Sequence, residues 1–173
     1  MIYTITTNPS LDYYLKLKDL KVGSLNRSYE ETYDAAGKGV NVSKFLDKLN
    51  IRSVALGFLG GFNKEFYISL LSDYVNIQPQ FTRIEDNTRI NIKLMAKETT
   101  SLNALGPKIT DDEFDKFKVR MNQIYDNDFV IMSGNVQKDL ADKMCGVIKD
   151  LIDNNVKVIL DTDDYITSKV SAY

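Results

Sequence analysis

Residues 35–50, AAGKGVNVSKFLDKLN, join a glycine turn to an amphipathic run. Gly37 and Gly39 flank Lys38, and glycine lets the backbone turn sharply and approach a ligand closely. The apolar residues that follow recur at helical spacing, which predicts a helix burying the face made by Val42, Phe45, Leu46 and Leu49. The first N–H groups of a helix are unpaired and lie at the positive end of its dipole, which suits an anion. The stretch therefore predicts a turn–helix unit that binds a polar, phosphorylated small molecule.

Two better-known glycine motifs do not fit this stretch. A Walker A loop needs glycine at position 32 and a hydroxyl residue after Lys38, but Thr32 and Gly39 occupy those positions. A Rossmann fingerprint needs a third glycine where Val42 stands. Neither a P-loop nor a dinucleotide-binding fold is supported. A glycine-rich helix start without any ligand stays open as the alternative interpretation.

The composition excludes several classes of function. The 173 residues suit a single domain, and 43% hydrophobic with 27% charged residues predicts a packed, soluble core. A net charge of −2 without a basic block argues against nucleic acid as a partner. The chain has no histidine, which excludes histidine-based triads and histidine-ligated zinc, and we assign no metal ligand. The single Cys145 is expected to be buried. Without a signal peptide or an apolar run of membrane-spanning length, we expect a cytoplasmic protein.

Strands and helices alternate along the chain, which predicts an α/β fold with a mostly parallel sheet flanked by helices. Short buried strands are expected at 2–7, 53–58 and 129–132, and a further strand at 156–160. A Thr110–Glu113 capping box is expected to begin a helix. Asp12 is expected in a loop beyond the first strand. Two more polar segments, roughly 13–34 and 80–103, predict a small, partly exposed β-lid, with strands at 80–84 and 89–94 joined by a turn. The whole chain, 1–173, is interpreted as one truncated domain.

Several stretches together resemble a known family. They are TTNPSLDYY (6–14), AGKGVNVSKFL (36–46), NTRINIKL (87–94), VIMSGNVQK (130–138) and VILDT (158–162). In this order they resemble the N-terminal portion of the ribokinase-type (PfkB) carbohydrate kinases, and they span nearly the whole chain. Within that family the pattern is most similar to the 1-phosphofructokinase branch, and next to the tagatose-6-phosphate kinase branch.

The resemblance implies a role for each matching position. Asp12 would bind sugar hydroxyls. The sugar and its oxyanion would be held by Gly37, Lys38 and Asn41. Arg89 would reach the phosphate from the lid, although a solvated strand charge is its plain alternative. The far side of the cleft would be lined by Asn103 and Asn135.

The resemblance also implies an activity. The complete protein would transfer the γ-phosphoryl group of ATP, with Mg²⁺, to fructose 1-phosphate, giving fructose 1,6-bisphosphate; tagatose 6-phosphate is the alternative acceptor. Relatives also suggest a homodimer formed through the lid. The family's Gly-Ala-Gly-Asp signature, with its catalytic aspartate, and its ATP-binding strands do not occur within these 173 residues. We therefore assign no catalytic residue, expect the chain alone to be inactive, and keep a non-catalytic sugar-phosphate-binding fragment as an alternative. A further departure is Gln137, which stands where the family commonly has proline.

Overall fold

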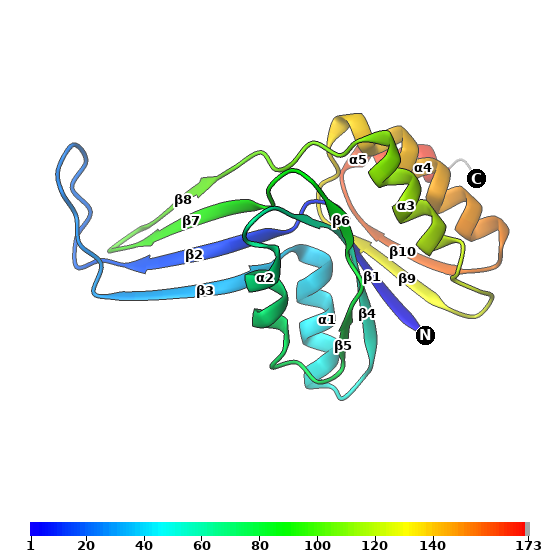
Figure 1. Cartoon of the computed structure of the whole chain (residues 1–173), viewed down its shortest axis with the longest axis horizontal. Helices are drawn as coiled ribbons and strands as arrows, with labels where there is room; N and C mark the ends of the chain where they lie inside the picture. Colours follow the sequence, from blue (N-terminus) through cyan, green and yellow to red (C-terminus); the bar gives the residue numbers. More distant parts are fainter. Residues whose placement is uncertain (172–173) are drawn as a thin grey trace.

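The computed structural model describes residues 1–171, and in them the strands form two separate sheets (Figure 1). The larger sheet runs in the order β10-β9-β1-β4-β5, with β6 also pairing with β4, and its pairings are parallel. Its strands are β1 (Ile2–Thr6), β4 (Ser53–Gly60), β5 (Ile77–Pro79), β6 (Thr82–Ile84), β9 (Phe129–Ser133) and β10 (Lys157–Asp161). These bounds confirm the strands expected from the sequence to within one or two residues, although β10 is partly exposed, with Ile159 50% exposed.

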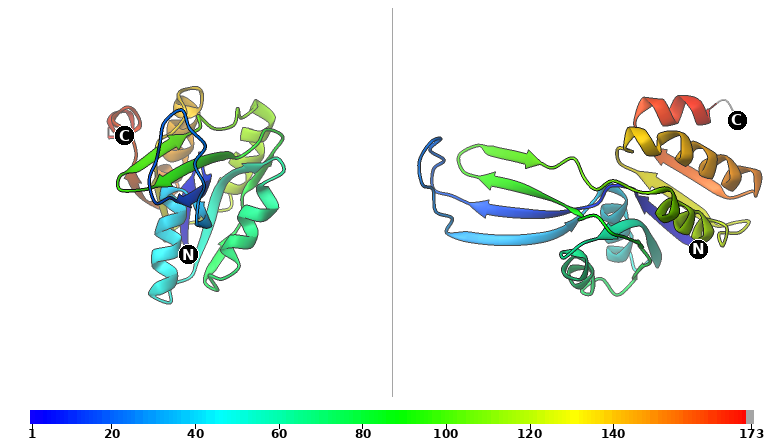
Figure 2. Two further views of the ribbon diagram at one scale, coloured as in Figure 1. Left: turned by 90° about the vertical axis from the view of Figure 1, so that its left-hand side faces the viewer. Right: turned by 45° about the horizontal axis from the view of Figure 1, so that its top comes forward.

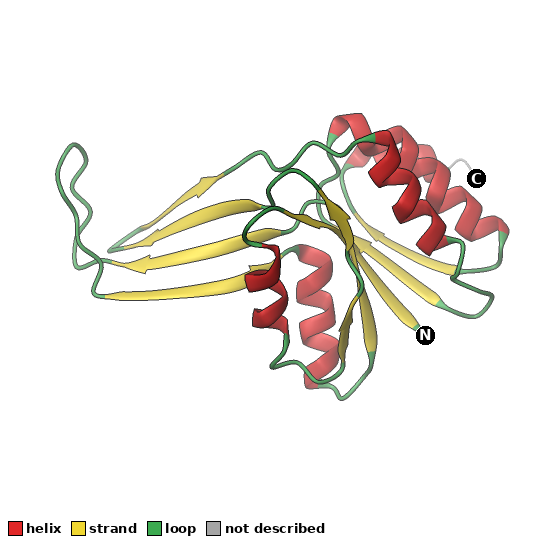
Figure 3. Cartoon of the chain, viewed as in Figure 1, coloured by secondary structure: helices red, strands yellow, loops and turns green. Residues whose placement is uncertain are grey.

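Helices cover both faces of the larger sheet (Figure 3). They are α1 (Lys38–Lys48), α2 (Lys64–Leu71), α3 (Asp111–Met121), α4 (Lys138–Asp153) and α5 (Asp164–Val170). Helices α1 and α2 pack on one face, and α3, α4 and α5 on the other. The Thr110–Glu113 capping box is present at the start of α3, as expected. The mostly parallel, helix-flanked α/β fold is therefore confirmed.

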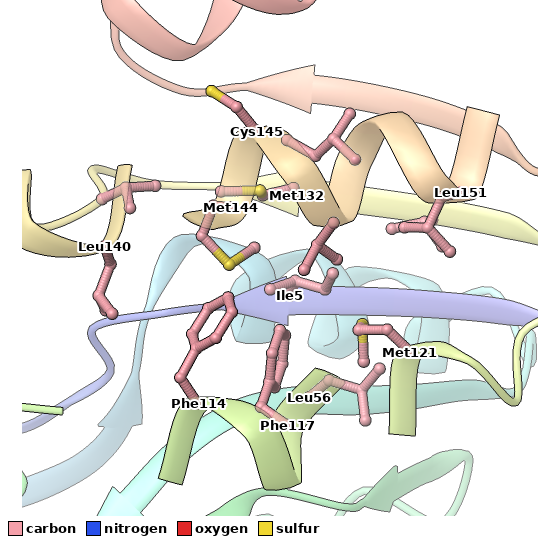
Figure 4. Close-up of a cluster of buried hydrophobic side chains, with 14 of the residues drawn as sticks. Ile5, Leu56, Phe114, Phe117, Met121, Met132, Leu140, Met144, Cys145 and Leu151 are labelled. Carbon is pink, nitrogen blue, oxygen red and sulfur yellow. The ribbon is translucent and has the colours of Figure 1, made fainter. Parts of the chain in front are cut away.

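The main hydrophobic core lies between the sheet and helices α3 and α4. Figure 4 shows Phe114 and Phe117 of α3 facing Ile5 of β1 and Leu56 of β4. The rings of Phe58 and Phe117 lie 4.8 Å apart between centroids, so aromatic packing adds to simple burial here. Cys145 of α4 is 3% exposed, which agrees with its expected place in the core.

In the described part of the chain, no helix is long and apolar enough to cross a bilayer.

Helix α1 buries a different face from the one that its apolar residues predict. Phe45 and Leu49 are 61% and 54% exposed, while Gly39, Val40, Ser43 and Lys44 are buried. A Cβ atom at Gly39 would lie 2.5 Å from the carbonyl oxygen of Ile5, so the helix approaches β1 through its smallest residue. Ser43 then hydrogen-bonds to Thr4 and Ser53, at 2.7 and 2.9 Å. The close approach of Gly39 to β1 and the hydrogen bonds of Ser43 therefore bury this face of α1 rather than the face that carries Phe45 and Leu49.

The second sheet projects away from the body (Figure 2). Its order is β3-β2-β7-β8, formed by β2 (Ser10–Lys16), β3 (Glu30–Ala36), β7 (Arg89–Met95) and β8 (Thr99–Asn103). The sequence-based bounds need two corrections. Residues 82–84 pair with β4 in the larger sheet, so the projecting segment starts at Arg89 rather than at 80. Asp12 lies within β2, not in a loop, because Asn8 and Pro9 form only a short break before the chain becomes extended again.

Two glycine-to-alanine substitutions should change stability in opposite directions. In Gly39→Ala the new methyl group meets the backbone of β1, so α1 must shift, and the free energy of unfolding should fall by about 1–3 kcal/mol. Gly146 of α4 has open space around its Cβ position, so Gly146→Ala should raise the free energy of unfolding by about 0.5–1 kcal/mol through helix propensity. Urea denaturation followed by circular dichroism measures both. Equal stability of Gly39→Ala and the unmodified chain would contradict the close helix–strand contact.

Candidate functional site

A polar cavity of about 500 Å³ lies where the two sheets meet, at the carboxyl ends of β1 and β9. In open parallel α/β sheets, ligands bind at these strand ends. The cavity is lined by Thr6, Thr7, Asn8, Gly37, Lys38, Arg89, Asn103, Ala104, Leu105, Ser133, Gly134, Asn135, Val136 and Gln137. Among these lining residues Lys38 and Arg89 carry charge, and both are positive. The cavity therefore suits an anionic ligand that also offers hydrogen-bonding groups.

The amino end of α1 opens onto this cavity. Gly37 is the N-cap with φ at 148°, a backbone conformation that favours glycine, and a Cβ there would lie 2.6 Å from the methyl carbon of Thr6. The N–H of Val40 donates to Thr6 Oγ1 at 3.0 Å. The preceding N–H groups, of Lys38 and Gly39, belong to the first turn, which has no intrahelical acceptor for them. Of these two residues Lys38 lines the cavity, whereas Gly39 is buried against β1, so the N–H of Lys38 can serve a bound anion at the positive end of the helix dipole.

Lys38 is held beside the carboxyl end of β10. Its Nζ lies 3.7 Å from Asp161 Oδ2, and Ser133 Oγ donates to the same oxygen at 2.7 Å. The hydrogen bond from Ser133 and, next, the charge of Lys38 lower the pKa of the Asp161 carboxyl. The N–H of Gly134 also donates to the Asp161 carbonyl, at 2.9 Å. The Lys38 ammonium therefore lies beside the Asp161 carboxylate at one wall of the cavity, and both side chains remain largely exposed to solvent.

Arg89, the first residue of β7, also lines the cavity, and its side chain reaches two other segments of the chain. Its Nη2 donates to the carbonyl oxygen of Asn8 at 3.0 Å, and its Nη1 donates to that of Ala104 at 3.2 Å. Burial lowers the pKa of the guanidinium, and the charge of Asp12 opposes this shift; arginine nevertheless stays protonated at neutral pH. Arg89 therefore links β7 to the segments that contain Asn8 and Ala104, and it also lines the cavity.

The segment that follows β8 forms another wall, and side chains from distant parts of the chain hold it. Asn8 Nδ2 donates to the carbonyl oxygen of Leu105 at 2.9 Å. Gln137, the N-cap residue of α4, donates from Nε2 to the carbonyl oxygen of Pro107, also at 2.9 Å. With the Arg89 bond to Ala104, three donors fix residues 104–107, which we call the strap.

The structure brings together five of the seven residues that the sequence singled out. Gly37, Lys38, Arg89, Asn103 and Asn135 all line the cavity. Asp12 and Asn41 are not among the lining residues. Asp12 is 8% exposed and accepts hydrogen bonds from Ser10 Oγ and Asn91 Nδ2, at 2.7 and 2.9 Å. Asn41 is exposed on α1, and its N–H donates to Gly37. Ligand contacts by these two residues stay predictions.

Other residues at the site carried no role in the sequence-based interpretation. Asn8 and Gln137 line the cavity, and Asp161 positions Lys38. Each follows the carboxyl end of a parallel strand or ends one, which is the signal that could have identified them. In the described residues, no group of three or more histidine, cysteine or acidic side chains could hold a metal ion.

Comparison with known proteins adds evidence of kinship. A model described as "pfkB family carbohydrate kinase" matches residues 6–172. The chain is 41% identical over 163 residues to a 1-phosphofructokinase of Borreliella burgdorferi, covering 94% of this chain and 53% of that protein. It is 37% identical over 162 residues to the 1-phosphofructokinase of Bacillus subtilis, covering 93% and 53%. The chain thus spans about half the length of the curated relatives it matches.

A solved structure agrees with the fold. Phosphofructokinase-2 from Escherichia coli, in complex with substrates and products, matches with a TM-score of 0.92 at 23% sequence identity, covering 99% of this chain and 57% of that one. At this identity the likeness is one of fold.

Proposed function

Because the chain belongs to the pfkB family of carbohydrate kinases, we propose that it carries the sugar-phosphate-binding half of an ATP-dependent kinase. The reaction we propose for the whole enzyme is phosphorylation of fructose 1-phosphate to fructose 1,6-bisphosphate. Relatives that are 37% and 41% identical and bear the name 1-phosphofructokinase support this choice of acceptor. Tagatose 6-phosphate is the alternative acceptor.

The observation that carries the proposal is the charge pattern of the cavity. Lys38, Arg89 and the amino end of α1 surround a space whose lining includes no acidic residue among those described. A phosphate monoester is close to a dianion at neutral pH, and it is stabilised by helix N–H groups and by ammonium or guanidinium donors. The remaining polar lining, from threonine, asparagine and glutamine side chains, suits the hydroxyl groups of a sugar.

ATP and Mg²⁺ are implied by the family rather than by this chain's residues. No acidic cluster for a metal ion occurs in residues 1–171. The proposed contribution of these residues is to bind and orient the acceptor sugar, and to exclude water from it. In the whole enzyme, MgATP would be held by the part of the fold that the relatives have in addition to the region matched here. We propose that the whole enzyme is cytoplasmic.

Isothermal titration calorimetry of the purified chain tests this proposal. Fructose 1-phosphate should bind, tagatose 6-phosphate more weakly, and unphosphorylated fructose much more weakly than either, because the cationic wall then has no anion to bind. Lys38→Ala should reduce binding of both sugar phosphates. Equal binding of fructose and fructose 1-phosphate, or no binding of either sugar phosphate, would contradict the proposed site.

A non-catalytic sugar-phosphate-binding protein is the second candidate. The half-length match to the relatives favours it, because an isolated half could bind the acceptor without transferring phosphate. The intact mass of the protein purified from its natural source, compared with the length of the coding frame, separates a natural short protein from a piece of a longer one.

We further propose that the projecting sheet pairs two copies of the chain. Ile90, Ile92 and Leu94 lie opposite Leu11, Tyr13 and Leu15 in register, so one face of the sheet is largely apolar. Tyr33 on this face is 44% exposed, and Phe66 beside it 42%.

Sedimentation equilibrium should report a dimer, since an exposed apolar face of this kind is stabilised by burial against another. The double substitution Tyr33→Glu with Ile92→Lys should shift the population to monomer. The exposed Val119→Lys on α3 is the control and should leave the dimer intact. A strictly monomeric chain at high concentration would refute this pairing.

A further inference from the structure

We propose that Lys93, on β7 of the projecting sheet, is a third cation of the site and binds the phosphate group of the sugar ligand at the mouth of the cavity. This inference rests on the proposed function. It adds a specificity-determining residue, one that distinguishes a phosphorylated sugar from a neutral one. Lys93 is not among the lining residues itself, but it is hydrogen-bonded to Asn103, which lines the cavity.

The Lys93 side chain points toward the cavity end of the projecting sheet. Lys93 shares a face of β7 with Arg89 and Asn91, because side chains in a strand alternate between its two faces. In register Lys93 stands opposite Ser101 of β8, yet its Nζ donates to Oδ1 of Asn103 at 3.0 Å. Asn103 stands opposite Asn91, which is two positions closer to Arg89. The lysine therefore leans along the sheet toward Arg89 and the cavity.

The Lys93 ammonium is not neutralised by a carboxylate in the part of the chain that the structure describes. The acceptor that it finds there, the amide oxygen of Asn103, carries no charge. Its neighbours in register on β2 and β8, Tyr14 and Ser101, are uncharged as well. An ammonium group has three N–H donors, so the bond to Asn103 leaves two of them for a ligand.

The acidic side chains on the same face of the projecting sheet are already engaged. Strands β7 and β8 contain no acidic residue. On β2, Asp12 is 8% exposed and accepts the hydrogen bonds described above. On β3, Glu30 and Asp34 are each ion-paired with another lysine. The positive charge of Lys93 is therefore left for an anion that the protein itself does not supply.

A ligand in the cavity can reach this ammonium. Asn103 is exposed and Lys93 is only half-buried, so the hydrogen bond between them lies at the surface. A phosphate oxygen is a stronger acceptor for an ammonium group than a neutral amide oxygen is, because both partners are then charged. A phosphate near Asn103 would thus draw Lys93 onto itself. Lys93 extends onto the projecting sheet the positive lining that Lys38 and Arg89 provide.

Calorimetry on variants of the whole chain tests this proposal. Lys93→Gln keeps an N–H donor for Asn103 but removes the charge. It should weaken binding of fructose 1-phosphate by roughly tenfold, between the small effect of an exposed ion pair and the larger effect of a buried charged hydrogen bond. Lys93→Arg keeps the charge and should restore most of the affinity. Lys97→Gln removes the same charge from the exposed turn between β7 and β8 and is the matched control.

Salt dependence and a neutral ligand separate contact with the phosphate from a purely structural role. Added salt screens charges near the surface, so the affinity of the unmodified chain for fructose 1-phosphate should fall more steeply with ionic strength than that of Lys93→Gln. Fructose, titrated by amide NMR, should bind both chains equally. If Lys93→Gln weakens fructose and fructose 1-phosphate in the same proportion, Lys93 acts only by placing Asn103, and its role as a phosphate ligand is overturned.

The remaining outcomes separate this inference from the proposed function. If the unmodified chain binds fructose 1-phosphate and a Lys93→Gln chain with an unchanged melting temperature binds it equally well, the assignment of Lys93 is wrong while the proposed function stands. An equal loss in Lys93→Gln and Lys97→Gln would show a general effect of net charge and would also overturn it. If the unmodified chain binds no sugar phosphate, both proposals fail. A loss confined to Lys93→Gln and reversed in Lys93→Arg supports the assignment.

Discussion

The 173-residue chain by itself is expected to show no kinase turnover with fructose 1-phosphate and MgATP. Phosphoryl transfer requires a base or an equivalent group at the acceptor hydroxyl, and positive charge or N–H groups around the moving phosphoryl. No carboxylate is among the described residues that line the cavity. Asp161 lies close by, but its lowered pKa makes it a weak base, and Ser133 and Lys38 already engage it. Asp12 is buried and accepts hydrogen bonds from Ser10 and Asn91.

The expected loss is large because two catalytic contributions are missing together. General base catalysis contributes about two to four orders of magnitude and an anion-hole donor about two to three, so the chain should fall about four to seven orders below an ordinary kinase rate of about 1–100 per second. A coupled ADP-release assay on material of verified mass measures this. The Lys38→Ala chain, purified identically, reports contaminating host kinases. Turnover within the ordinary range that Lys38→Ala abolishes would show that the catalytic centre lies within these residues.

Arg89→Ala is expected to have the largest effect of any single substitution on sugar-phosphate binding. The guanidinium is half-buried, lines the cavity, and bridges the carbonyl oxygens of Asn8 and Ala104. Its removal takes away a charged contact to the ligand and loosens the strap. Affinity for fructose 1-phosphate should fall by about 2–4 kcal/mol, or roughly 30- to 1,000-fold, the range found when one partner of a buried charged contact is removed.

Arg89→Lys should recover little of this affinity, because a single ammonium group cannot donate in two fixed directions as a guanidinium does. The matched control is Arg83→Ala, which removes an exposed arginine on β6 outside the cavity. Calorimetry measures the affinities, and amide NMR spectra show whether the fold persists. Affinity unchanged in a folded Arg89→Ala chain would mean that Arg89 holds the strap and does not contact the ligand.

Local patterns predicted the elements of this fold well where one physical rule dominated. The Thr110–Glu113 pair predicted the start of α3 because a capping box satisfies two orphan groups within four residues. Residues 129–132 were recognised as a buried parallel strand because their short apolar run is bounded by polar residues and glycine, and β9 spans Phe129–Ser133. At the site, Gly37 and Lys38 followed from the same kind of local rule, a glycine turn before a helix.

Patterns failed where distant parts of the chain compete for the same surface. Val42, Phe45 and Leu49 predicted the buried face of α1, but the contacts of Gly39 and Ser43 with β1 and β4 turned Phe45 and Leu49 toward solvent. Thr82 was expected in the projecting sheet, yet its segment pairs with β4. In both cases the deciding contacts are with elements that lie far away in the sequence, so the local pattern does not record them.

The sequence by itself therefore determined the α/β class, the order of the elements, the turn at Gly37 and the kinship with carbohydrate kinases, because each of these depends on neighbouring residues or on motifs in chain order. Only the tertiary structure decided that Asp161 pairs with Lys38, and that the side chains of Asn8 and Gln137 both hydrogen-bond to the strap, residues 104–107. Those residues are separated by about thirty to over a hundred positions along the chain. Contacts at such separations form only when packing of the whole sheet offsets the entropy of closing the intervening loops, and no local pattern records that balance.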